Sequence, residues 1–250
     1  MKVSVITVCF NSVATLRDTI ESALAQTGVE LEYLVVDGAS KDGTAELLRG
    51  YAGRLDYVSE PDRGMYDALN KGIARATGEV IGILNADDRF EDARVLSDVA
   101  AAFASDAALD AVYGDIRFVR GESTSTTRYY SSAPWRPWMH NWGYMPAHPS
   151  VYVRRRVFER FGGYRLGYDI SADFEWMVRV FCRGRIVARY LPRCMVTMRL
   201  GGKSTGGPGK MLRLNVENVR ANRENGYFSC LPMMLPKYVY KILGYVFRRS

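Results

Sequence analysis

The chain has 250 residues and a mass of 28.1 kDa, with 48% hydrophobic and 24% charged residues, which excludes a disordered or collagen-like protein and predicts a sizeable folded core. Four scattered cysteines and two histidines argue against a zinc cluster or a disulfide scaffold. Together with a start that lacks a leader-like apolar stretch, they predict a protein of the reducing cytoplasm.

The formal charge of +7 is unevenly distributed along the chain. Residues 1–153 carry 14 Lys and Arg against 21 Asp and Glu, whereas residues 154–250 carry 20 against six. A basic half of this kind attracts anions. Nucleic acid, an anionic membrane face and a phosphorylated substrate are all open as partners on this ground, beside a plain solvated surface.

The first hundred residues alternate short β-branched runs with stretches of helical periodicity. The predicted strands cover residues 3–8, 33–36, 55–58 and 80–84. The first predicted helix begins after Asn11 or Ser12, and three further helices cover residues 44–51, 66–76 and 92–103. Strands that alternate with helices form parallel sheets with helices on both faces. The sequence therefore predicts an α/β fold with a mainly parallel central sheet.

The pattern is less regular after Tyr113. Residues 116–120 and 126–130 predict a hairpin around Gly121, and four prolines in the Trp-rich segment 133–149 predict an irregular loop. The remaining predictions are a helix whose first turn holds Asp173, strands over residues 185–190 and 195–199, and a flexible glycine-rich segment over residues 201–209.

The C-terminal stretch combines apolar and basic residues. Between Glu224 and Lys237 the uncharged run is twelve residues long, shorter than the roughly 20 that a membrane-spanning helix needs. From Leu235 to Arg249 the basic side chains fall on one face of a predicted helix and the apolar ones on the other. This pattern predicts a helix that lies on an anionic membrane surface, with docking on the protein's own core as the alternative.

Ligands of open parallel sheets bind beyond the carboxyl ends of the strands, so the residues there are the first candidates. Asp37 and Gly38 follow the second predicted strand, where a carboxylate can accept hydrogen bonds from a nucleoside. Asn85, Asp87 and Asp88 follow the fourth and offer oxygen ligands to a hard divalent cation that bridges a diphosphate. A glycine-rich dinucleotide fingerprint and a P-loop are both missing, which disfavours dehydrogenases and P-loop enzymes.

Five motifs in order, at residues 7–11, 37–44, 60–72, 76–79 and 84–88, resemble the family 2 glycosyltransferases, which have the GT-A fold. The resemblance is specific over residues 1–90 and looser to about residue 200. It implies a nucleotide-sugar donor, with a UDP-sugar expected, held by Thr7, Asn11, Asp37, Asp62, Asp67, Lys71 and Asp87. It also implies a metal site for Mg²⁺ or Mn²⁺ at Asp87, with Asn85 and Asp88 beside it. Many relatives carry Asp where this chain has Asn85, which implies a weaker metal site.

The same resemblance implies a catalytic carboxylate at the start of a helix in the second half, where Asp173 matches best. Glu175 precedes Arg179 by four residues, so an ion pair along the helix explains it. Asp173 has no such partner, and its place in a first helical turn suits a general base. The implied reaction is an inverting displacement in which Asp173 deprotonates an acceptor hydroxyl and the metal stabilises the leaving diphosphate.

Further candidates for contacts to the diphosphate or the acceptor are His148, Arg199, Lys203 and Ser204. The last three lie on or beside the glycine-rich segment, which we expect either to close over the donor or to be an inert linker. For His148 the alternative is a structural role. The tryptophans at positions 135, 138 and 142 either stack on sugar rings or pack internally.

These features predict a GT-A catalytic domain over residues 1–200, with a donor-binding half at 1–114 and an acceptor-binding half at 115–200. A flexible loop and a basic, amphipathic helical extension follow over 201–250. The predicted activity is transfer of a sugar to a saccharide acceptor, in the working hypothesis linked to polyprenyl diphosphate, during cell-surface polysaccharide assembly. The protein is expected to be cytoplasmic and peripheral on the inner face of the plasma membrane.

Three other functions compete with this prediction. A sugar nucleotidyltransferase would carry a glycine-rich, lysine-containing loop after the first strand, and that loop is missing. A catalytically silent glycan-binding or scaffold protein on the same fold stays open because of Asn85. Nucleic-acid binding is not expected, because the basic half contains no recognisable docking motif.

Overall fold

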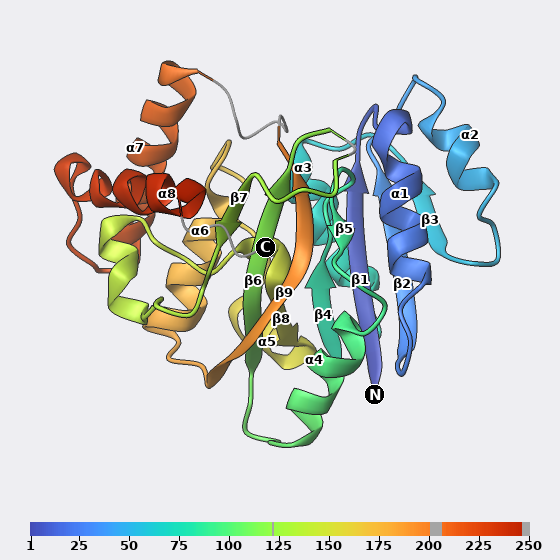
Figure 1. Ribbon diagram of the computed structural model, residues 1–250, viewed down its shortest axis with the longest axis horizontal. Helices are drawn as coiled ribbons and strands as arrows, with labels where there is room; N and C mark the ends of the chain where they lie inside the picture. Colours follow the sequence, from blue (N-terminus) through green and yellow to red (C-terminus); the bar gives the residue numbers. More distant parts are fainter. Residues whose placement is uncertain (122, 201–206, 247–250) are drawn as a thin grey trace.

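The computed structural model describes residues 1–121, 123–200 and 207–246 (Figure 1). Within these residues, nine strands form one sheet in the order β3-β2-β1-β4-β8-β6-β9-β5, with β7 paired to β6 outside this order. The strands are β1 (Lys2–Cys9), β2 (Glu30–Asp37), β3 (Asp56–Ser59), β4 (Val80–Ile83), β5 (Arg89–Phe90), β6 (Ala111–Val119), β7 (Arg128–Tyr130), β8 (Val151–Arg154) and β9 (Ala188–Arg199).

The sheet has a parallel half and a mixed half. Strands β1 to β4 are parallel, and the register aligns Cys9 with Asp37 and Asp37 with Ser59, so their carboxyl ends meet at one edge. This half agrees with the sequence prediction. In the mixed half, β8 runs antiparallel to β4 and β6, and β5 antiparallel to β9, whereas β6 and β9 are parallel.

Helices cover both faces of the sheet, as predicted. Alternation along β1 sends Val3 and Val5 into one apolar core and Ile6 and Val8 into the other. The first core is covered by α1 (Val13–Leu24), α2 (Thr44–Arg49) and α4 (Val95–Ala104). The second is covered by α3 (Met65–Arg75), α5 (Arg155–Phe161) and α6 (Ala172–Met177), the last continued by the π-helical turn η3 (Val178–Arg183).

Helix α3 packs unusually close to the sheet. A Cβ atom at Gly72 would lie 2.5 Å from Cγ2 of Ile6 on β1, so only glycine allows this approach. The close packing fixes the start of α3, which carries Tyr66 and Asp67, against the carboxyl edge of the parallel strands.

Two predictions for the second half were wrong. The proline-rich segment contains two 3-10 helices, η1 (Pro137–Trp142) and η2 (His148–Ser150), because proline is tolerated at the first positions of a helix, where its missing N–H is not needed. The two strands predicted between residues 185 and 199 are the single strand β9. Pro192 lies within a register shift of the β6–β9 ladder, where it interrupts no regular hydrogen bond.

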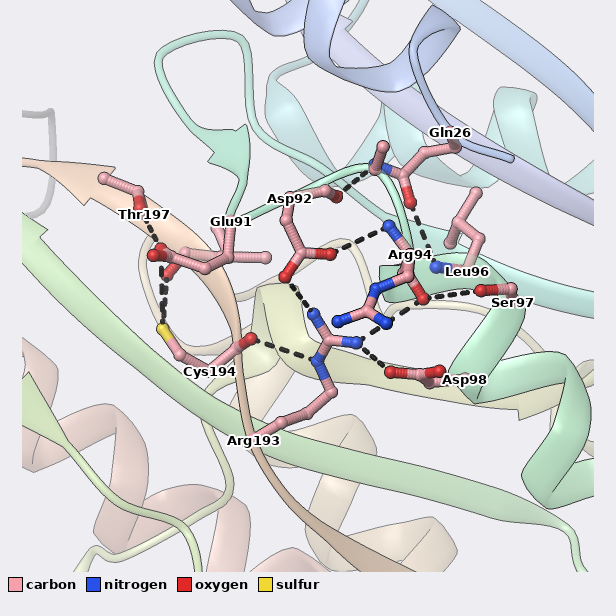
Figure 2. Close-up of polar contacts among 12 residues, drawn as sticks. Gln26, Glu91, Asp92, Arg94, Leu96, Ser97, Asp98, Arg193, Cys194 and Thr197 are labelled. Carbon is pink, nitrogen blue, oxygen red and sulfur yellow. Dashed lines mark hydrogen bonds and ion pairs between the residues drawn. The ribbon is translucent and has the colours of Figure 1, made fainter. Parts of the chain in front are cut away.

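Ion pairs and hydrogen bonds around Arg193 (the Arg193 joint) connect the two halves of the chain (Figure 2). Arg193 on β9 pairs with Asp92 at 2.6 Å and also with Asp98 on α4. On the same strand, Thr197 donates a hydrogen bond to Glu91. These contacts attach the short edge strand β5 and helix α4 to β9. The segments that they join are about 100 residues apart in the chain.

The C-terminal part lies on the side of the molecule opposite α2 and β3 (Figure 1). It consists of α7 (Pro208–Glu224), the 3-10 helix η4 (Leu231–Met234) and α8 (Pro236–Val246). Ala221 of α7 belongs to the same apolar core as Phe174 of α6, so α7 packs on the main body. Among the described residues, no helix has the length and apolar character needed to cross a membrane. The division of the chain at residue 200 stays a prediction.

Candidate active site

Asp37 is a buried carboxylate in the predicted donor region. It ends β2, is fully buried, and accepts hydrogen bonds from the Ser40 backbone N–H at 3.1 Å and the Ser59 hydroxyl at 2.6 Å. The Ser40 hydroxyl and the Cys9 thiol also donate to it. Burial and the neighbouring Asp37 raise the pKa of the Cys9 thiol, so Cys9 is a neutral donor. Several donors therefore fix the orientation of this buried carboxylate.

Thr7 and Asn11 have different surroundings. Thr7 is fully buried; its hydroxyl donates to the Leu84 carbonyl at 2.7 Å and lies 3.0 Å from the Tyr33 hydroxyl. Asn11 is exposed, has a φ of +50°, and accepts the Lys41 N–H at 3.0 Å. Asn11 therefore lies at the surface, whereas the buried Thr7 connects the end of β1 to Leu84, the residue that follows β4.

Asp62 approaches Asp37 from the loop after β3. Its carboxylate accepts the Gly64 N–H at 2.7 Å, and a Cβ atom at Gly38 would lie 2.5 Å from its Oδ2 atom. Glycine at position 38 is therefore what allows Asp62 to lie against the end of β2.

Asp67, which is buried, and Lys71 both lie on α3 and both have charged partners. Asp67 lies 2.9 Å from an Arg63 guanidinium nitrogen, and this hydrogen bond lowers the pKa of Asp67. The Lys71 ammonium is 2.8 Å from both the Glu60 carboxylate and the Pro61 carbonyl. Both side chains border the loop that holds Asp62.

The candidate metal ligands follow β4. Asp88 is almost completely buried; one carboxylate oxygen accepts the Asn85 amide N–H at 2.7 Å, and the other has no hydrogen-bond partner among the described residues. Burial and the charge of Asp87 raise the pKa of Asp88. In the described part of the chain, no group of three acidic, His or Cys side chains is arranged to hold a metal alone. Carboxylate and amide oxygens are the ligand types that a hard cation prefers, but the described residues alone do not form a complete metal site.

Asp173 lies in the first turn of α6, half-buried, as predicted. The Tyr66 hydroxyl is 3.1 Å from its Oδ1 atom and 2.6 Å from the Ile170 carbonyl, to which it donates. Burial and the charge of Asp173 raise the pKa of Tyr66, so the phenol stays protonated. The sequence prediction included Tyr66 in a motif but gave it no role, because its partner is 107 residues away.

His148 lies in the same neighbourhood. Its Nε2 atom is 2.8 Å from the Tyr164 hydroxyl, and the Tyr164 ring lies 5.7 Å from the Tyr66 ring. Burial lowers the pKa of His148, and the charge of Asp173 opposes this effect. His148 is therefore close enough to Asp173 for the carboxylate charge to affect its pKa. The rings of Tyr66 and Tyr164 lie next to this carboxylate.

The remaining predicted residues have other surroundings or lie outside the described chain. The expected ion pair between Glu175 and Arg179 is confirmed at 2.9 Å. Arg199 pairs with Asp18 on α1 and also lies beside Asp88, where its positive charge opposes the rise in the pKa of that carboxyl. Trp135 is buried, whereas the tryptophans at 138 and 142 are exposed. Lys203 and Ser204 lie outside the described residues.

Comparisons with known sequences agree with this geometry. Residues 4–167 match the profile of the family described as Glycosyl transferase family 2. A PGL/p-HBAD biosynthesis glycosyltransferase of Mycobacterium bovis (strain BCG / Pasteur 1173P2) is 30% identical over 197 residues, which cover 75% of this chain and 73% of the relative. An uncharacterized glycosyltransferase of Mycobacterium tuberculosis (strain H37Rv) is 32% identical over 181 residues, covering 71% and 68%.

Solved structures share the fold. Residues 1–349 of TarS from S. aureus give a TM-score of 0.68 at 15% identity, covering 100% of this chain and 76% of theirs; the chain spans 39% of a longer TarS chain. The mannosyltransferase PcManGT from Pyrobaculum calidifontis, solved with GDP-Man and Mn²⁺, gives 0.65 at 20% identity, covering 99% and 76%. The motifs, the sheet and these likenesses agree that the chain has the GT-A fold and belongs to glycosyl transferase family 2.

Proposed function

We propose that this glycosyltransferase transfers the sugar of a nucleotide-sugar with inversion of the configuration at its anomeric carbon, and that Asp173 is the general base. The observation that carries the proposal is the half-buried Asp173 carboxylate, which contacts Tyr66 from α3, the helix that follows the carboxyl end of β3. An inverting transfer needs only one base. The acceptor oxygen loses its proton to Asp173 and bonds to the anomeric carbon, while the bond from that carbon to the diphosphate oxygen breaks.

The donor is assigned to the edge formed by the ends of β1, β2 and β4. Asp37, Asn11 and Asp62 surround its nucleoside part, Thr7 supports the strand ends, and Asp67 and Lys71 shape the loop beside it. A UDP-sugar is the proposed donor. In support, the fold neighbour TarS 1–349 was solved with UDP-GlcNAc, although PcManGT was solved with GDP-Man.

Mg²⁺ or Mn²⁺ is proposed to bind at Asp87, with the amide oxygen of Asn85 and the buried Asp88 next to it. One carboxylate oxygen of Asp88 is buried without a hydrogen-bond partner among the described residues, and the pKa of this group is raised; both support a cation here, because a positive charge would offset the repulsion between Asp87 and Asp88. When bound, the ion supplies positive charge that stabilises the leaving diphosphate.

The acceptor is proposed to be a lipid-linked saccharide at the inner face of the plasma membrane. Leu235, directly before α8, and Val239 and Ile242 on α8 are 62%, 61% and 63% exposed, and the sequence contains no acidic residue after Glu224. Exposed apolar residues beside unbalanced cations suit an anionic bilayer surface. In support of a biosynthetic role, the relative from Mycobacterium bovis is named a PGL/p-HBAD biosynthesis glycosyltransferase.

The base is tested by Asp173→Asn in transfer assays with a panel of nucleotide sugars and saccharide acceptors. We expect turnover to fall by about 10²- to 10⁴-fold, the usual contribution of a general base, while donor affinity changes less than about twofold. Asp169→Asn is the matched control, because this nearby carboxylate is exposed and pairs with Arg213. Full turnover in Asp173→Asn would remove the assignment.

A further inference from the structure

A carboxylate from the C-terminal part of the chain holds the segment that leads to Asp173. Glu217 on α7 is 8% exposed, and its two oxygens accept the backbone N–H groups of Asp169, Ile170 and Ser171 at 3.0, 3.0 and 2.9 Å. Both sides of this contact lie beyond residues 4–167, the part that the family profile covers.

The three hydrogen bonds satisfy backbone N–H groups of the segment that precedes α6. Ser171 is the residue directly before the helix, and its own side chain makes no capping hydrogen bond. Backbone N–H groups outside helices and strands need an acceptor from elsewhere when they are buried. Hydrogen bonds to an ionised carboxylate are roughly twice as strong as neutral ones, so Glu217 restrains this segment firmly.

Two further contacts hold the segment and α6. From α3, the Tyr66 hydroxyl donates to the Ile170 carbonyl at 2.6 Å. From the C-terminal end of α7, the Asn225 side chain donates to Glu175 at 3.2 Å. Glu217 on α7 therefore holds the chain at Ser171, two residues before Asp173. Asn225, which directly follows α7, holds it at Glu175, two residues after Asp173.

We propose that Glu217 is a positioning residue for Asp173, and that α7 is part of the active-site scaffold. The inference rests on the proposed function, in which Asp173 is the base. A displacement of about 1 Å at a reacting group can lower a rate about 100-fold. Loss of the three hydrogen bonds frees the 169–171 segment, so the rate of the chemical step depends on Glu217 through the backbone that leads to Asp173.

The test is Glu217→Gln in the full chain, which keeps the size but turns an amide NH₂ group toward backbone donors. We expect kcat to fall about 10- to 100-fold, with donor affinity, measured by calorimetry, within about twofold of the parent protein. Amide hydrogen exchange at residues 169–171 should accelerate, and other helices should keep their protection. Glu224→Gln is the matched control on the same helix, because the described contacts of Glu224 are to the side chains of Arg165, Tyr168 and Arg220.

An unchanged kcat in Glu217→Gln, with exchange accelerated at residues 169–171, overturns the inference. A general loss of protection, with kcat and donor affinity reduced together, also overturns it, because Glu217 would then serve overall stability. Asp173→Asn is measured in parallel: if it stays active, the proposed base fails, whereas an inactive Asp173→Asn beside a fully active Glu217→Gln removes only the present inference.

A second variant covers the case in which Glu217→Gln does not fold. Glu217→Asp keeps the carboxylate and shortens the side chain by one methylene group, which draws the acceptor away from the three backbone N–H groups. A fall in kcat together with faster exchange at residues 169–171 supports the inference. Parent-like kcat in Glu217→Asp, with exchange accelerated at residues 169–171, counts against it.

Discussion

Two carboxylates share the first turns of α6 but have different surroundings. Glu175 is fully buried and receives Arg179 at 2.9 Å, Arg165 at 3.3 Å and the Asn225 amide. Asp173 is half-buried, and the Tyr66 hydroxyl and the Phe174 backbone N–H, both neutral groups, lie within hydrogen-bond distance of it. A carboxylate that is balanced by cations on several sides is structural, whereas one bordered by neutral donors retains the capacity to accept a proton.

Replacing Asp87 with Ala should weaken donor binding only when metal is present. We expect donor affinity in Mn²⁺ to fall about tenfold, because the ion loses a carboxylate ligand and then bridges the diphosphate less tightly. Adding a chelator should bring the parent protein to the level of the variant. Asp56→Ala is the control, since Asp56 is exposed at the opposite end of β3. Equal affinity of parent and variant in Mn²⁺ would contradict the metal site.

The sequence indicates the residues of the site better than their contacts. The pair of Glu175 and Arg179 is predictable because helical neighbours four residues apart always share a face. The partners of the Asp173 segment are not: Tyr66 is 107 residues away and Glu217 about 46. Such contacts depend on how α3, α6 and α7 pack in three dimensions, which no local spacing encodes.

At the scale of elements, α7 shows what hydrophobic periodicity misses. Its side facing the protein contains the buried polar residues Glu217, Asn218 and Asn222 beside Val219 and Ala221. These polar groups are stable inside because they find partners, such as the hydrogen bond from the Asn222 amide to the His140 carbonyl at 3.0 Å. A pattern search that counts apolar residues therefore predicts α1 and α3 but does not single out α7.

Lys237 on α8 should lower stability at neutral pH. Burial and the nearby Lys241 lower the pKa of Lys237 to about 8, against an ordinary value of 10.5. Between these values the unfolded chain binds more protons than the folded one, so the contribution improves as pH rises from 8 to 10.5, and the full cost applies below pH 8. Lys237→Met should raise the free energy of unfolding at pH 7 by about 1 to 3 kcal/mol.

Chemical denaturation at pH 7 and pH 10.5 measures this effect. The gain of Lys237→Met should be largest at pH 7 and nearly vanish at pH 10.5. Lys41→Met is the control, because Lys41 is exposed in a different part of the molecule and its removal should change stability little. An equal gain at both pH values, or a less stable Lys237→Met, would show that the ammonium group is not buried at a cost.

For the whole molecule, the alternation of elements predicts the parallel half of the sheet but not the order of the other strands. Strand β5 has two residues and pairs Arg89 with Thr197, more than 100 residues along the chain. Strand β8 has four residues and lies between β4 and β6 in antiparallel orientation. Strands this short have weak sequence signals, and long-range packing such as the Arg193 joint decides where they pair (Figure 2).

The charge asymmetry and the exposed apolar face of α8 make a joint prediction for the full chain. Sedimentation with anionic vesicles should show binding that weakens as salt rises, and vesicles of zwitterionic lipid should bind much less. Val239→Asp combined with Ile242→Asp should weaken binding at least about tenfold, because each buried apolar side chain contributes about 1.5 to 3 kcal/mol. The pair is exposed, so the fold should be preserved.

Val187→Asp combined with Leu166→Asp is the matched control for vesicle binding, since both of these apolar side chains are exposed outside α8. The control should bind vesicles as the parent protein does. If the α8 variant also binds unchanged, α8 does not contact the membrane. If it loses vesicle binding but still transfers sugar to a soluble acceptor, the catalytic edge works independently of the bilayer, and α8 serves to bring that edge to a lipid-linked acceptor.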